Sequence, residues 1–265
     1  MKLIGVDVDG TLVNSKRVIT EKTREALISA MKAGHKVVIV TGRPTAGARN
    51  LAEALEFDKY GGLISSFNGG AITDFATGKV LANHEMDHDL AVDMIKLAKD
   101  LPLETMVPFM DTVFSPKIGP YTEGEARTLR MVAKEVEDLD QTLDFPVNKI
   151  LFAADPDLID EPTSKIKERF GDLTEQVKSA RFYYEVMPRG LSKGNSLLEI
   201  AEIFNIDQKD IIAFGDEMND ETMIEAAGVG VAMGNAVSKI KEIADYVTLT
   251  NDEDGIAYYL DKFLL

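Results

Sequence analysis

The chain has 265 residues, and its 45 acidic against 29 basic side chains give a formal net charge of −16. Such a surface repels nucleic acid and anionic membranes, so we expect neither as a partner. The absence of cysteine excludes disulfides, thiolate catalysis and cysteine-ligated metal sites. No apolar run approaches the roughly 18 residues of a membrane span, and we expect a cytoplasmic protein of one large domain or two.

The first segment is an apolar strand that ends in two aspartates. Residues 3–6 are Leu-Ile-Gly-Val, and Asp7, Asp9 and Gly10 follow. Glycine permits a tight turn at this point. Carboxylates at the carboxyl end of an α/β strand suggest a nucleophile, a proton carrier and a cation site. The alternative is a strand that ends in a solvated acidic turn.

The next segments alternate between helix and strand. Helices are predicted over residues 20–33 and 44–56, and strands over residues 36–40 and 62–67. This alternation implies a parallel sheet. A hairpin follows, with strands at 71–74 and 79–82 around a Thr-Gly turn.

The pattern changes between residues 84 and 187. Helices are predicted at residues 89–101, 123–139 and 157–170, and strands at 106–115, 148–154 and 181–185. This order predicts an α+β insert with an antiparallel sheet and helices on one side. Parallel alternation resumes at residue 188. We therefore predict an α/β fold, with a Rossmann-like three-layer core from residues 1–83 and 188–265 and an inserted domain from residues 84–187.

Polar residues follow several of the predicted parallel strands. Because the carboxyl ends of parallel strands share one edge of a sheet, these residues should converge in space. Several carboxylates gathered without histidines favour a hard cation such as Mg²⁺. The residues are Asp7 and Asp9; Thr41, Gly42 and Arg43; Asn68 and Gly69; and Asp216, Asn219 and Asp220.

Thr41 and Gly42, together with Lys193, suit an anionic ligand such as a phosphoryl group. Thr41 offers a hydroxyl and Gly42 an accessible backbone amide. Lys193, at the start of a predicted helix, offers an ammonium group. Each also has a plain structural interpretation, because Thr-Gly-Arg-Pro can simply turn a strand into a helix and most lysines are solvated. Likewise, Asp216 and Asp220 are acids of a kind that commonly caps helices.

Taken together, these residues resemble the haloacid dehalogenase superfamily, in particular the Cof-like hydrolase branch with a type-two cap. The motif Asp-x-Asp-Gly-Thr occurs at Asp7–Thr11, the second motif matches Thr41, the third matches Lys193, and Gly-Asp-x-x-Asn-Asp spans Gly215–Asp220. The insert lies between the second and third motifs, where this branch carries its cap. The resemblance covers essentially the whole chain, and Phe67–Gly70 resembles the stretch that precedes the cap.

The resemblance implies a role for each motif residue. Asp7 would attack phosphorus and form an aspartyl phosphate, and Asp9 would protonate the leaving alkoxide and then activate water. Mg²⁺ would rest on Asp7, the Asp9 backbone carbonyl and Asp216, and Asp220 would orient its waters. The implied phosphate-binding residues are Thr41, Gly42, Lys193 and Asn219, and further candidate substrate-binding residues are Arg43, Asn68 and Gly69.

The leading hypothesis is a Mg²⁺-dependent phosphatase for small phosphorylated metabolites, with sugar phosphates as the favoured substrates and the insert as a lid. The alternatives are a phosphomutase or phosphotransferase, and a phospholigand-binding regulator without turnover. Arg181, Tyr183 and Phe109 are candidates for reading the leaving group. The glycine-rich stretch of residues 228–234 resembles a dinucleotide fingerprint, but its third glycine is one residue late, so a dinucleotide cofactor is not expected.

Overall fold

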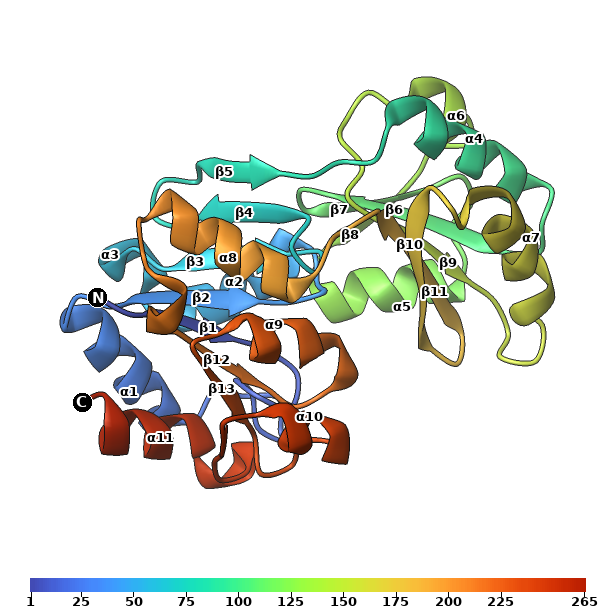
Figure 1. The fold of residues 1–265 in the computed structure, drawn as a ribbon. Helices are drawn as coiled ribbons and strands as arrows, with labels where there is room; N and C mark the ends of the chain where they lie inside the picture. The colour runs from blue at the N-terminus through green and yellow to red at the C-terminus, as the bar shows by residue number, and fades with distance from the viewer. The chain divides into compact units, whose positions relative to one another are not determined.

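The computed structural model describes residues 1–265 and divides into two compact units (Figure 1). Unit 1 comprises Met1–Ala82 and Ser192–Leu265, and unit 2 comprises Asn83–Leu191. No helix in either unit combines the length and the apolar character needed to cross a membrane.

Unit 1 is built on a mixed sheet in the order β14-β13-β12-β1-β2-β3-β4-β5. The strands from β14 to β3 are parallel, and β4 pairs antiparallel with β3. The predicted α/β fold is therefore confirmed. The strand bounds are β1 Leu3–Val6, β2 Lys36–Val40, β3 Leu63–Ser66, β4 Ala71–Asp74, β5 Val80–Asn83, β12 Ile211–Gly215, β13 Val229–Ala232 and β14 Tyr246–Val247.

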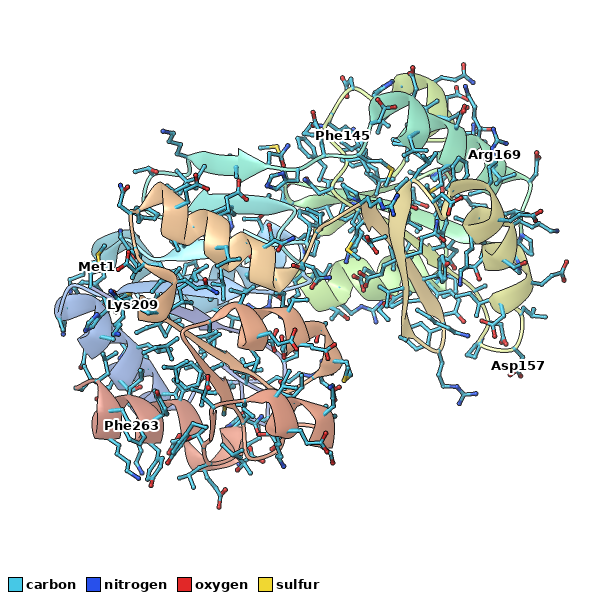
Figure 2. All side chains as sticks on the ribbon, viewed as in Figure 1. Met1, Phe145, Asp157, Arg169, Lys209 and Phe263 are labelled. Atoms are coloured by element: carbon cyan, nitrogen blue, oxygen red, sulfur yellow. The ribbon has the colours of Figure 1, made fainter.

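Helices pack on both faces of this sheet, with α1 against α11 and α8 against α9 (Figure 1). The Thr20 side chain caps α1 by accepting from the Thr23 amide, as expected for a threonine at a helix start. The last helix carries the half-exposed Phe263 (Figure 2). The helical bounds are α1 Glu21–Lys32, α2 Thr45–Ala54, α3 Phe57–Tyr60, α8 Lys193–Ile203, η1 Gln208–Asp210, η2 Met218–Asp220, α9 Glu221–Ala226, α10 Ser238–Ile243, η3 Asn251–Glu253 and α11 Gly255–Phe263.

Unit 2 contains its own sheet, in the order β10-β11-β9-β6-β7-β8. Its strand pairs are antiparallel except β7 with β8, which is parallel. Helices α4, α6 and α7 cover one face and α5 covers the other (Figure 1). The bounds are α4 His88–Lys99, β6 Glu104–Phe109, β7 Thr112–Ser115, α5 Pro120–Leu129, β8 Val132–Glu135, α6 Leu139–Thr142, β9 Ile150–Ala153, α7 Asp160–Phe170, β10 Thr174–Ala180 and β11 Tyr183–Pro188.

The predicted helix over residues 123–139 is wrong in its second half. Helix α5 ends at Leu129, and Arg130 adopts the left-handed conformation with φ of 55°. The following residues have helix-forming composition, but they pair with β7 as the edge strand β8. Tertiary pairing therefore overrides local propensity here. The sequence patterns also missed β10, and they placed all the helices on one side of the sheet, whereas α5 lies on the opposite face.

Candidate active site

Three buried carboxylates meet at the carboxyl edge of the unit 1 sheet. Asp7 follows β1, Asp216 follows β12, and Asp220 closes the short helix η2. The parallel register pairs Val6 with Phe214, which brings Asp7 and Asp216 to the same level. One oxygen from each carboxylate lies within 4.8 Å of the others. The topology therefore brings these side chains together, as their positions at strand ends predict.

One lysine bridges two of these carboxylates. The Lys193 Nζ atom lies 2.6 Å from Asp7 Oδ1 and 2.6 Å from Asp220 Oδ1, and its side chain is fully buried. Lys193 is the first residue of α8, and Ser192 caps that helix by accepting from the Asn195 amide. The helix start thus fixes the lysine stem and directs its ammonium group into the cluster.

The third carboxylate, Asp216, is held by neutral donors. The Thr11 hydroxyl donates to Asp216 Oδ1 at 2.8 Å, and the Asn235 amide lies 3.5 Å from Oδ2. Gly10 has φ of +85°, and a Cβ atom built there would lie 2.1 Å from Asp216 Oδ2. Glycine is therefore required both for the turn and for the close approach of Asp216.

Thr11 and Asn235 are two residues of the site that the sequence patterns did not predict. Thr11 belongs to the first motif, and Asn235 comes shortly after β13, directly after the glycine-rich stretch of residues 228–234. The Asn235 amide also donates to the Gly10 carbonyl at 2.8 Å. Asn235 could have been predicted by the rule used for the other strands, because a polar residue that follows a parallel strand lies at the shared edge of the sheet.

The electrostatics of the cluster leave an excess of negative charge. Burial raises the pKa of Asp7 to about 7, and the charges of Asp220 and Asp216 add to this while Lys193 opposes it. Burial also raises the pKa of Asp216 to about 6, against the Thr11 hydrogen bond. Burial alone would lower the pKa of Lys193, but the charges of Asp7 and Asp220 outweigh it and raise that pKa.

This donor set fits a divalent cation. Asp7 and Asp216 offer hard oxygen ligands. Burial and the neighbouring carboxylates raise their pKa values, and a bound cation would favour their ionised forms. Asp220 is more fully engaged, because its Oδ2 accepts from the Asp216 amide at 2.8 Å and the Glu217 amide at 3.0 Å while Oδ1 meets Lys193. Asp7 and Asp216 are thus the carboxylates best able to hold a metal.

Asp9 lies apart from this cluster. Its side chain is 61% exposed and forms a two-pronged ion pair with Arg43, with Nε–Oδ2 at 3.0 Å and Nη2–Oδ1 at 2.6 Å. This geometry is the strong, planar arrangement that guanidinium and carboxylate groups prefer. The two aspartates of the first motif therefore differ in environment: Asp7 is buried beside Lys193, whereas Asp9 faces solvent beside Arg43.

The ends of β2 and β3 complete this edge of the sheet. The Asn68 amide donates to the Thr41 carbonyl at 2.9 Å, and the Thr41 hydroxyl accepts from the Arg43 amide at 3.2 Å. A Cβ atom on Gly42 would lie 3.1 Å from Asn68 Oδ1, and one on Gly69 would lie 2.8 Å from the Ser192 carbonyl oxygen. These loops therefore converge at the start of α8.

Asn219 is the one predicted phosphate-binding residue whose side chain remains exposed, on η2 next to Asp220.

Known proteins are similar to this chain in sequence and in fold along nearly all of its length. The family model for haloacid dehalogenase-like hydrolases matches residues 4–260. The Bacillus subtilis 5-amino-6-(5-phospho-D-ribitylamino)uracil phosphatase YwtE is 31% identical over 290 residues, which cover 100% of this chain and 98% of that relative.

Two solved structures agree. A haloacid dehalogenase-like hydrolase from Bacteroides thetaiotaomicron has a TM-score of 0.94 at 33% identity, with 99% of each chain covered. A haloacid dehalogenase subclass IIB sugar phosphatase has a TM-score of 0.81 at 25% identity, again with 99% of each chain covered.

The fold and the site together define the class of this protein. It is an α/β enzyme with a carboxylate cluster at the carboxyl edge of its sheet. The chain belongs to the haloacid dehalogenase-like hydrolase family, and it is a phosphatase of that family. The resemblance noted from its motifs is confirmed.

Proposed function

We propose that this protein is a Mg²⁺-dependent phosphatase that hydrolyses phosphate monoesters of small metabolites, with sugar or polyol phosphates as substrates. The observation that carries the proposal is the buried Asp7–Lys193–Asp220 network beside Asp216. It combines a carboxylate nucleophile, a fixed ammonium group for a phosphoryl oxygen and a second carboxylate for a cation. The names of the sugar phosphatase and of the ribitylaminouracil phosphatase support a polyhydroxylated substrate.

In the proposed first step, an ionised Asp7 oxygen attacks phosphorus. A bond forms between that oxygen and phosphorus, and the bond from phosphorus to the leaving oxygen breaks. Asp9, once it has left Arg43 and taken up a proton from solvent, donates that proton to the leaving alkoxide. Its exposed position suits a group that exchanges protons, and its pairing with Arg43 must open for this step. The product is an aspartyl phosphate on Asp7 and a free alcohol.

In the second step, Asp9 takes a proton from a water molecule that attacks phosphorus. The bond between Asp7 and phosphorus breaks, inorganic phosphate leaves, and both carboxylates return to their starting states. Lys193 stays charged throughout, because the neighbouring carboxylates raise its pKa. Its ammonium group stabilises the negative charge on the transferred group.

The metal would be held by Asp7, the Asp9 backbone carbonyl and Asp216, with Asp220 orienting its waters. When bound, Mg²⁺ would neutralise charge on the phosphoryl oxygens and on the carboxylates. It would also keep Asp7 ionised, because a nearby positive charge lowers a carboxyl pKa.

We propose that the phosphoryl oxygens of the substrate are bound by Thr41, Gly42, Lys193 and Asn219. Further contacts with the substrate would come from Arg43, Asn68 and Gly69. Support comes from the convergence of the β2 and β3 ends at the start of α8.

The inserted segment would act as a lid over the site. We propose residues 84–187 as a cap that selects the leaving group and residues 1–83 with 188–265 as the catalytic core. Residues such as Arg181, Tyr183 and Phe109 would contact the alcohol part of the substrate. We further propose that the protein acts in the cytoplasm on small phosphorylated metabolites.

The test is phosphate release from sugar phosphates, polyol phosphates, nucleotides and an aryl phosphate, with Mg²⁺ and with a chelator. We expect Mg²⁺-dependent turnover that Asp7→Asn lowers by at least about 10³-fold, because the amide keeps the shape but is no nucleophile. Asp157→Asn, a change at an exposed loop acid, is the matched control.

Turnover that survives Asp7→Asn would refute the mechanism. Release only in the presence of an acceptor alcohol would indicate a phosphotransferase instead. Tight binding of phosphoesters without turnover would indicate a regulator.

A further inference from the structure

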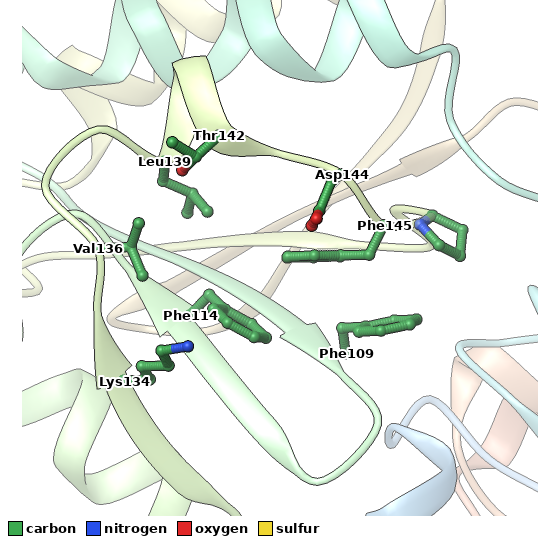
Figure 3. A pocket seen from close by; sticks show the side chains of 9 residues that line it. Phe109, Phe114, Lys134, Val136, Leu139, Thr142, Asp144 and Phe145 are labelled. Carbon is green, nitrogen blue, oxygen red and sulfur yellow. The ribbon is translucent and has the colours of Figure 1, made fainter.

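Unit 2 contains a cavity that the proposed chemistry does not use. It has a volume of about 560 Å³ and is formed entirely by residues of this unit (Figure 3). Its walls come from β6, β7, β8, helix α6 and the loop that follows α6. The lining residues are Phe109, Phe114, Lys134, Val136, Leu139, Thr142, Asp144, Phe145 and Pro146.

Three phenylalanine rings form one wall of this cavity. Phe145 stacks on Phe109 with centroids 4.7 Å apart and planes 13° apart, and it lies 4.6 Å from the Phe114 centroid. All three rings are partly exposed, and Phe114 and Phe145 also pack against the core of this unit. Phe145 uses part of its ring surface to contact the other two rings, and the parts of the three rings that stay exposed offer an aromatic surface to another planar ring.

The sheet register explains why these groups share one wall. Phe114 pairs with Val107 on β6 and with Lys134 on β8, so the three side chains lie on one face of the sheet. Val107 is fully buried under the helices of that face, whereas Phe114 and Lys134 lie further out along the same row. The cavity is therefore the uncovered end of the apolar layer between the sheet and the short helix α6.

Two opposite charges complete the cavity. The Lys134 ammonium group lies 5.4 Å from the Phe114 ring centroid, and Asp144 lies next to Phe145 in the loop. Both side chains are exposed, and neither forms an ion pair within the protein. Lys134 can therefore donate to an acceptor on a ligand, and Asp144 can accept from a donor.

From this combination we infer that the cavity is a binding site for a small planar heterocycle that offers a carbonyl oxygen to Lys134 and an N–H group to Asp144. Stacking on the phenylalanine rings would supply affinity, and the two charged groups would fix the orientation of the ring. The ring is either the leaving group of the phosphorylated substrate or a separate small molecule. The existence of the site is a matter of binding alone, and only the assignment of the ring to the leaving group rests on the proposed function.

The probe for this site is lumazine, a fluorescent planar heterocycle with ring carbonyl and N–H groups. The chain contains no tryptophan, so the emission of the probe is read with little interference from the protein. We expect saturable binding to the full-length protein without any phosphoester. Uracil should displace the probe, and 5,6-dihydrouracil should do so less well, because it keeps the polar groups but loses the flat ring.

Two variants test the residues. Phe145→Leu should weaken lumazine binding by at least about fivefold, because a stacking ring is lost. Lys134→Met keeps the length of an exposed side chain and should weaken binding by roughly tenfold. The matched controls are Phe263→Leu on α11 (Figure 2) and Lys178→Met on β10. Neither residue lines the cavity, so both variants should bind lumazine as the wild type does.

Absence of saturable binding would overturn the inference, as would equal displacement by uracil and dihydrouracil. Because Lys134 is exposed, Lys134→Met is expected to fold normally, so unchanged binding by this variant would also overturn the site. Aryl-phosphate turnover with added lumazine then distinguishes the source of the ring. A rise in KM alone indicates the leaving group of the substrate, and unchanged KM indicates a separate ligand; both results support the site.

Discussion

Each unit buries a lysine beside at least one carboxylate, but the balance of charge differs between the two units. In unit 1, Lys193 faces two carboxylates at 2.6 Å, with a third, Asp216, close by. In unit 2, the Lys149 ammonium pairs with Glu185 at 3.1 Å, and these side chains are 4% and 14% exposed. Buried charges are costly unless they are paired. In unit 2 one positive charge balances one negative charge, so the pair needs no further ion. In unit 1 the carboxylates outnumber the lysine, and a bound cation would balance their excess negative charge.

The largest effect is expected from Lys193→Met. Removing the only cation of the cluster leaves buried carboxylates unpaired, which should lower the free energy of unfolding by about 3–5 kcal/mol. Phosphatase activity should fall by on the order of 10³-fold, because a charged phosphate contact is lost. Urea unfolding measured with and without Mg²⁺ checks this, and we expect Mg²⁺ to restore part of the stability but not the activity. An unchanged unfolding free energy without metal would contradict the comparison.

Lys149→Met should destabilise the protein by a similar amount, about 3–5 kcal/mol, because Glu185 is left buried without its partner. Here Mg²⁺ should give no specific recovery. The double variant Lys149→Met/Glu185→Leu should regain most of the loss, since an apolar pair can replace a buried ion pair. Urea unfolding of both variants is the measurement. If Mg²⁺ restored the unfolding free energy of Lys149→Met, the two units would not differ in their need for a cation.

Thr11→Val tests how the third carboxylate is held. The change removes the 2.8 Å hydrogen bond to Asp216, so we expect Mg²⁺ affinity to fall by about 10-fold to 100-fold. Calorimetric titration with Mg²⁺ checks this. Thr20→Val is the matched control, because Thr20 also donates to a carboxylate, that of Asp254, outside the cluster. Equal Mg²⁺ affinities for the wild type and Thr11→Val would show that this bond does not orient a ligand.

The last prediction concerns pH. The pKa values of Asp7 and Asp216 in the folded protein are raised to about 7 and about 6, above the usual 3.8. The folded state therefore binds protons more tightly than the unfolded chain, and this stabilisation is lost as pH rises through about 6 and 7. Without metal, Tm should fall between about pH 5 and about pH 8, and Mg²⁺ should flatten the slope. Asp7→Asn should also flatten the slope of Tm against pH. A Tm that rises with pH in the absence of metal would contradict this prediction.

The parallel half of the fold was the more predictable. The strand predicted at residues 36–40 is β2, and the predicted helix at 20–33 contains α1 with its Thr20 cap. Buried parallel strands are short apolar runs bounded by helices, so the local pattern and the tertiary structure agree. In unit 2 they disagree at residues 130–135. That segment becomes an edge strand because β7 is available to pair with it, which no local pattern reveals.

The candidate site divides in the same way. Its chemical groups, and their places after consecutive strands, could be read from the sequence, because parallel strands must end at a common edge. The hydrogen-bond and ion-pair partners of these groups could not be read from the sequence. Only the tertiary structure decides that Lys193 binds Asp7, 186 positions away in the sequence, and Asp220, 27 positions away. It also decides that Asn235 donates to the Gly10 carbonyl and that Asp9 pairs with Arg43 outside the carboxylate cluster. Hydrogen bonds and ion pairs depend on fractions of an ångström, and side-chain packing rather than residue order sets those distances.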